Sequence, residues 1–121
     1  MSNSTDEKLF DLGILEAMDD QEYTREMINT YIADTPTELR KMYVSLQKSS
    51  PEELAKTAHK LKSSTAVFQS SRLVGLLENI ERSAKTGNAF ISLKQLYEDI
   101  EKQYRALEAG LKGQLQLLAK G

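Results

Sequence analysis

Apolar residues along most of the chain recur every three or four positions, which is the spacing of one face of a helix. The longest such stripe runs over residues 20–48 and has Pro36 near its middle. Proline removes one backbone hydrogen bond and kinks or breaks a helix. Because the stripe keeps its phase on both sides of Pro36, we predict one kinked helix rather than two. Its apolar positions are Tyr23, Met27, Tyr31, Leu39, Met42 and Leu46.

Four further stripes predict the remaining helices. A short first helix is expected over residues 10–18, and two helices of intermediate length are expected over residues 51–68 and 71–85. The last helix is predicted to begin near residue 90 and to fray at its far end, where two glycines lower the helix propensity.

Residues with cap and turn preferences separate these stripes. Asp20 is a suitable N-cap for the long helix. Ser50 precedes Pro51, and Glu53 follows Ser50 by three positions, which is the spacing of a capping box. Gly87 is expected to end the fourth helix as its C-cap.

Short connections of this kind make neighbouring helices antiparallel. We therefore predict an all-α fold, an up-and-down antiparallel four-helix bundle with a short additional N-terminal helix. Residues 1–8 are polar and are expected to be disordered, whereas residues 9–121 are expected to form the bundle.

The composition narrows the possible functions. The 121 residues fit one domain and include one histidine and no cysteine, which excludes disulfides, thiolate metal sites and cysteine nucleophiles. A formal net charge of -2 argues against nucleic-acid binding, which draws on a basic surplus. No apolar run approaches the roughly 20 residues that cross a bilayer, and the polar start does not resemble a secretory signal. We expect a cytoplasmic protein that does not bind a membrane, a metal or a cofactor.

The single histidine, His59, lies on the third predicted helix. At about 100° per residue, Leu54, Leu61 and Phe68 fall at about 180° to 220° from it. The core direction is therefore nearly opposite to His59, and we expect the imidazole to project outward from the bundle.

Small and basic residues share the face of His59. Ala55, Ser63 and Ala66 are predicted to let a partner approach the imidazole closely. Lys56 and Lys62 lie within one helical turn and would offset part of the charge of a phosphoryl group on the ring. Lone surface histidines often have no function, and surface lysines often serve solubility alone, so this face leaves both interpretations open.

The sequence around His59 resembles the signature of histidine-containing phosphotransfer (HPt) domains, which is approximately A-H-x-L-K-G-S. The preceding run 31–36, with its proline, and the apolar helix that follows also resemble this family, so the resemblance covers about residues 10–100. The residues that match the signature are Ala58, His59, Leu61, Lys62 and Ser64.

Two positions depart from the family pattern. The family glycine four residues after the histidine is Ser63 here, which adds a small polar group to the approach face. The second family glycine, ten residues after the histidine, is Gln69, near the predicted bend between the third and fourth helices. Neither change removes the phosphoaccepting residue.

The resemblance implies that His59 accepts a phosphoryl group from an aspartate of a receiver domain and passes it to another receiver in a multistep phosphorelay. The implied partners are receiver (response-regulator) domains and a hybrid sensor kinase. The protein itself would be a monomeric carrier without ATP-dependent activity of its own, and it would not be an enzyme.

The resemblance also implies site roles. A group on the next helix would hold the imidazole in one tautomer, and by matching position this is Glu81, with Glu78 as its neighbour. Solvated helix charges are the alternative for both glutamates. Lys62 has the family match for charge neutralisation, whereas Lys56 is inferred from the helical geometry alone. Three apolar residues are candidates for either a docking face or the core: Ile14, Leu15 and Ile32.

The alternative function is a phosphorylation-independent adaptor, a helical bundle that binds a partner through a groove. An adaptor would tolerate His59→Gln, whereas a phosphocarrier would lose all of its acid-labile, base-stable label. A coiled-coil assembly module is a further alternative, which the short loops and varied stripes disfavour. A hydrolytic or metal enzyme is disfavoured because the chain has no second histidine and no cysteine.

Overall fold

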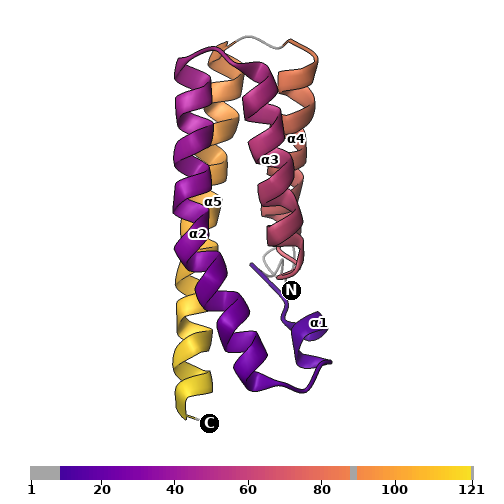
Figure 1. The fold of residues 1–121 in the computed structure, drawn as a ribbon, viewed down its shortest axis with the longest axis vertical. Helices are drawn as coiled ribbons and strands as arrows, with labels where there is room; N and C mark the ends of the chain where they lie inside the picture. The colour runs from indigo at the N-terminus through magenta and orange to yellow at the C-terminus, as the bar shows by residue number, and fades with distance from the viewer. Residues whose placement is uncertain (1–8, 88–89, 121) are drawn as a thin grey trace, which may run out of the picture.

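The computed structural model describes residues 9–87 and 90–120, and this part of the chain contains five helices and no strand. Successive long helices run in opposite directions, which confirms the predicted up-and-down antiparallel bundle (Figure 1). The segment predicted to be disordered, residues 1–8, lies outside the described residues. The helices are α1 (Gly13–Glu16), α2 (Gln21–Gln47), α3 (Pro51–Ala66), α4 (Ser71–Lys85) and α5 (Phe90–Lys120).

The long helix α2 continues through Pro36, as predicted. Its first turn is capped by Asp20, whose side chain accepts a hydrogen bond from the backbone N–H of Tyr23 at 3.0 Å. Figure 1 shows the two halves of α2 inclined to each other, which is expected where a proline removes one intrahelical hydrogen bond.

The first helix is shorter than predicted, because residues 10–12 precede it without helical structure. The backbone N–H of Asp11 donates to the carbonyl oxygen of Phe68 at 2.8 Å, so this segment is held on the turn between α3 and α4. The Asp11 carboxylate accepts a hydrogen bond from the N–H of Gly13 at 2.8 Å, and α1 begins at that residue.

The ends of α3 and α5 differ in part from the prediction. Ser50 is the N-cap residue of α3 and Pro51 occupies the first turn, but the Ser50 side chain makes no capping hydrogen bond. The far end of α5 does not stop at its glycines and continues to Lys120. Gly110 lies against the ring of Phe10, where an added Cβ would come within 2.7 Å of a ring carbon, so the missing side chain is used for close packing. Gly87 has a φ of 78°, as expected for the residue that ends α4.

The core runs the length of the bundle, and α2 and α5 extend beyond the hairpin formed by α3 and α4 (Figure 1). The segment that includes α1 lies at this extended end, where Leu12 and Leu15 are buried in the common core. The residues predicted to lie opposite His59 are buried, as expected: Leu54, Leu61 and Phe68.

Candidate functional site

His59 projects from the middle of α3 into solvent, and its side chain is 62% exposed. The opposite side of α3 packs into the core, so the direction of the imidazole follows from the apolar pattern of this helix. A ring in this position is accessible to another protein without any opening of the bundle.

Glu81, on the adjacent helix α4, holds one ring nitrogen of His59. Its Oε2 atom lies 3.0 Å from His59 Nδ1, and its side chain is only 11% exposed. The carboxylate therefore reaches the ring from the protein side and leaves the outer edge of the imidazole towards solvent.

Two lysines from different helices also bind the Glu81 carboxylate. Lys62 Nζ lies 3.2 Å from Oε1, and Lys85 Nζ lies 3.2 Å from Oε2, the atom that also contacts His59. Burial alone would raise the pKa of Glu81, but hydrogen bonds from the two lysines and the nearby positive charge hold this pKa below its ordinary value. Glu81 is therefore ionised at neutral pH.

The ionised state of Glu81 determines which ring nitrogen of His59 carries a proton. A carboxylate can only accept hydrogen bonds, so Nδ1 of His59 must be the donor in this contact. In the neutral ring the other nitrogen, Nε2, then carries a lone pair. The site thus presents an exposed nucleophilic nitrogen whose ring is fixed from behind.

A comparison with protein families matches residues 26–119 to the Hpt domain. The chain belongs to the Hpt domain family. Its fold is similar to the crystal structure of histidine-containing phosphotransfer protein B from Pseudomonas aeruginosa PAO1, with a TM-score of 0.82 and 22% sequence identity over 89% of this chain and 95% of that chain. A search of curated proteins gives no match.

Membership of this family assigns the chain to histidine phosphotransfer in phosphorelays, in which Hpt domains act as phosphoryl carriers and interact with receiver domains. None of the helices in residues 9–87 and 90–120 combines the length and the apolar character that a bilayer span requires. Within the same residues, no three His, Cys, Asp or Glu side chains are grouped so that they could hold a metal ion.

The residues predicted around His59 fall into two groups. Glu81 binds the imidazole and Lys62 binds Glu81, whereas Glu78 does not bind the ring and lies 3.9 Å from Lys62 Nζ, with its side chain 56% exposed. Lys56 is exposed on α3, one turn before His59.

The predicted close-approach surface needs one correction. Ala55 is buried, with an exposed fraction of 5%, because it belongs to the hydrophobic core on which α3 packs. Ser63 and Ala66 are exposed as predicted, so the open part of this surface is formed by these two residues. The Ser63 hydroxyl donates to the carbonyl oxygen of His59 at 3.3 Å, within the same helix.

The three apolar candidates for a docking face differ in how much of their side chains is exposed. Leu15 is a core residue, with an exposed fraction of 1%, and Ile32 is half-buried against the core. Ile14 is 51% exposed on α1, and Met18 beyond the end of α1 is 56% exposed. Of the candidates, only Ile14 therefore offers most of its side chain to a partner.

Sequence reasoning missed Lys85, the second lysine bound to Glu81. The signal was present, because Lys85 follows Glu81 by four positions on one helix, a spacing that brings opposite charges together. Only the contact between α3 and α4 shows that this ordinary helix pair includes the carboxylate that binds the imidazole.

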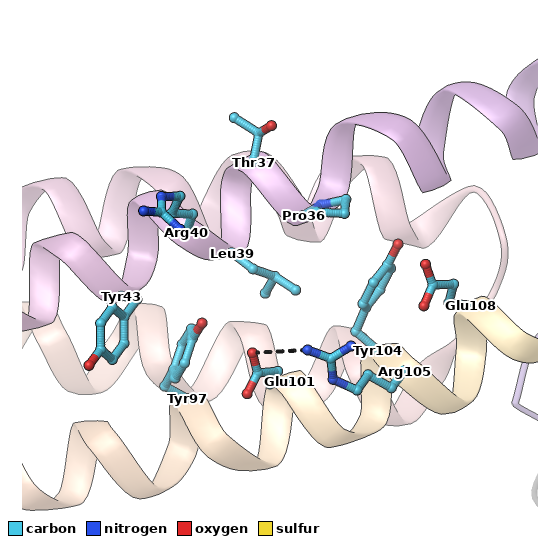
Figure 2. A pocket seen from close by; sticks show the side chains of 10 residues that line it. All are labelled: Pro36, Thr37, Leu39, Arg40, Tyr43, Tyr97, Glu101, Tyr104, Arg105 and Glu108. Carbon is cyan, nitrogen blue, oxygen red and sulfur yellow. Dashed lines mark ion pairs between the residues drawn. The ribbon is translucent and has the colours of Figure 1, made fainter.

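A cavity of about 560 Å³ lies away from this site, between α2 and α5, and its lining does not include His59. Figure 2 shows Tyr43 facing Tyr97 across the two helices, with ring centroids 5.8 Å apart, and Arg105 reaching Glu101 along α5. Tyr104 also lines this cavity, but its hydroxyl oxygen is buried.

Proposed function

We propose that His59 is the phosphoaccepting residue of this Hpt domain and that Nε2 is the reacting atom. One observation supports this proposal most directly: the imidazole is exposed while Glu81 binds Nδ1 from the protein side. A fixed tautomer with a free outer nitrogen is the form of histidine that can act as a nucleophile.

The reaction transfers a phosphoryl group from an aspartyl phosphate of a receiver domain. The Nε2 lone pair forms a bond to phosphorus while the bond between phosphorus and the aspartate oxygen breaks, and the aspartate leaves as a carboxylate. The proton stays on Nδ1, so the phosphorylated ring is an imidazolium, and Glu81 offsets its positive charge. The reverse sequence of bond changes delivers the group to a second receiver.

The lysines at the site would offset the negative charge of the phosphoryl group. Lys62 has the better position for this role, because it already lies beside the imidazole through Glu81, while Lys85 contributes a second positive charge from α4. Lys56 remains a candidate from its place one turn before His59. Ser63 and Ala66 would form the exposed small-residue surface over which the receiver approaches.

The proposal extends to the partners. The donor and the acceptor would both be receiver domains, one of them part of a hybrid sensor kinase, and the Hpt domain would act as a monomer. It would have no ATP-dependent activity of its own, because the group arrives already activated on the receiver. A cytoplasmic location goes with this role, because the phosphoryl group originates from ATP in the kinase.

A labelling experiment tests this proposal. The wild-type protein and His59→Gln are incubated with a panel of receiver domains that carry a labelled phosphoryl group. We expect the wild type to take up label that is lost in acid and retained in base, and we expect His59→Gln to take up none. Uptake of the same label by His59→Gln would overturn the assignment of His59.

The adaptor alternative gives a different result in the same experiment. An adaptor would bind a receiver equally well as wild type or His59→Gln, and neither protein would take up label from any member of the panel. Binding measured alongside labelling therefore separates the two functions.

A further inference from the structure

Gln69 occupies a backbone position that usually favours glycine. Its φ is 52°, in the left-handed region, at the turn between α3 and α4. A glutamine side chain is strained by this conformation, whereas glycine is not. Its side chain is nevertheless engaged, because Gln69 Nε2 donates to the backbone carbonyl oxygen of Asp11 at 3.1 Å.

This hydrogen bond completes a two-point attachment of Asp11 to the turn. The Asp11 N–H donates to the carbonyl oxygen of Phe68, and the Asp11 carbonyl accepts from the Gln69 amide, so both backbone groups of one residue are bound to consecutive residues of the turn. We call this pair of hydrogen bonds, between Asp11 and residues 68–69, the Asp11 clasp.

The clasp holds the segment that leads into α1. Asp11 is followed directly by the buried Leu12, and its carboxylate binds the N–H of Gly13, the first residue of α1. Exposed apolar side chains then follow, with Ile14 at 51% and Met18 at 56% exposure. The clasp therefore joins an exposed apolar surface to the end of the helix that carries His59.

The distance from His59 to the clasp suits one docked protein. Ala66, the last residue of α3, follows His59 by seven residues, which is about 10 Å along the helix axis, and the turn that carries the clasp begins directly after it. A transient or standard interface covers about 600 to 800 Å² on each partner, which is a disc with a radius of about 14 to 16 Å. A receiver domain centred on His59 would thus reach α1 at its edge.

We propose that Gln69 is a positioning residue, which holds α1 through the Asp11 clasp so that Ile14 contacts the receiver domain docked at His59. This inference rests on the proposed function. The clasp contributes to receiver affinity and makes no contact with the reacting atoms. Removing it should weaken docking and leave the chemical step unchanged.

The test uses Gln69→Gly, which removes the amide and relieves the backbone strain, and Ile14→Ser, which removes the exposed apolar contact. Gln95→Ala, on the exposed side of α5, is the control. The probe is the phosphorylated receiver that transfers fastest to wild type, and the concentration of Hpt protein is varied. A second probe is phosphoramidate, a small phosphoryl donor that requires no docking surface.

We expect both variants to raise the half-saturating concentration about fivefold to tenfold. The maximal transfer rate and the rate with phosphoramidate should stay within twofold of wild type, which a general loss of folding would not allow. A half-saturating concentration within twofold of wild type, for either variant, would overturn the inference. Absence of transfer to the wild type from every receiver is a separate result, which would overturn the proposed function as well.

Discussion

The face formed by α3 and α4 carries an exposed imidazole, whereas the face formed by α2 and α5 carries a cavity, and the volume of a cavity does not show which face is functional. The α2–α5 face has a cavity of about 560 Å³, with aromatic side chains and two arginines. The α3–α4 face has an exposed imidazole held by a buried carboxylate. A group that another protein must reach has to be exposed and oriented, and the volume of a groove elsewhere on the surface does not bear on that requirement. The proposed phosphotransfer site therefore lies on the α3–α4 face.

The charges on the two faces are also organised differently. On the α3–α4 face one carboxylate, Glu81, binds three donors from two helices. On the α2–α5 face Arg105 pairs with Glu101 one turn away on the same helix, which is an ordinary surface pair with little energetic weight. Only the Glu81 arrangement joins two helices and fixes the orientation of the imidazole. We therefore expect mutations on the α3–α4 face to lower phosphoryl transfer and mutations on the α2–α5 face to leave it nearly unchanged.

The largest effect is expected from His59→Gln compared with Arg105→Gln. The first variant should accept no phosphoryl group, because no other histidine exists in the chain. The second should transfer within about twofold of wild type, because exposed ion pairs contribute little. Labelling with a phosphorylated receiver measures both. Loss of transfer in Arg105→Gln, without unfolding, would break the distinction between the two faces.

The next effect is expected from Glu81→Ala. This change frees the imidazole to rotate and to change tautomer, and it leaves Lys62 and Lys85 without their shared partner. Loss of a group that orients a reactive histidine typically costs about 10-fold to 100-fold in activity. Glu81→Gln is the matched control, because its amide oxygen can still accept from Nδ1, so its rate should fall less. Single-turnover transfer at saturating receiver gives both rates, and equal rates for the two variants would contradict the orienting role.

Much of the fold could be predicted from the sequence, because the apolar stripes are long and keep a helical period. The continuity of α2 through Pro36 and the bounds of α4 were predicted correctly. The turns were less predictable. Gly87 signals its left-handed conformation, but Asp19, Ser49 and Gln69 adopt positive φ values without such a signal. The first helix was predicted too long, because its start depends on hydrogen bonds to a turn more than 50 residues away.

The candidate site was predictable to a similar degree. The outward direction of His59 follows from the residues of its own helix, so periodicity was sufficient. The burial of Ala55 and the part played by Lys85 depend on how the helices pack against one another, and no pattern within one helix contains that information. Matching position correctly put Glu81 beside the imidazole, and Glu78, named as its neighbour, lies beside Lys62 instead.

A smaller effect is expected from Lys62→Met and Lys85→Met, which compare two lysines within the α3–α4 face. Lys62 has a side chain 23% exposed, whereas that of Lys85 is 65% exposed and its charge is better screened by water. We expect the transfer rate to fall about tenfold in Lys62→Met, which corresponds to roughly 1.4 kcal/mol, and about twofold to threefold in Lys85→Met. The salt dependence of both rates provides the check, and a larger effect for Lys85→Met would reverse the assigned roles.

The smallest effect on transfer is expected from Tyr104→Phe, on the α2–α5 face. The Tyr104 hydroxyl is buried and has no hydrogen-bond partner within the described residues. Removing an unsatisfied buried hydroxyl is neutral or stabilises a fold by about 1 kcal/mol. Transfer from a receiver should remain within about twofold of wild type, because the change lies on the other face.

The pH dependence of stability sharpens this last prediction. Burial raises the pKa of Tyr104 well above the ordinary value of about 10, and burial raises the pKa of Tyr31 to about 12. Above pH 10 the unfolded chain releases these protons while the folded chain retains them, so the free energy of unfolding falls as pH rises. Tyr104→Phe removes one of these contributions and leaves those of Tyr31 and of Tyr97, whose pKa burial also raises. Urea unfolding at pH 7 and at about pH 10.5 should therefore show a smaller loss in the variant than in wild type, and an equal loss would contradict the burial of this hydroxyl.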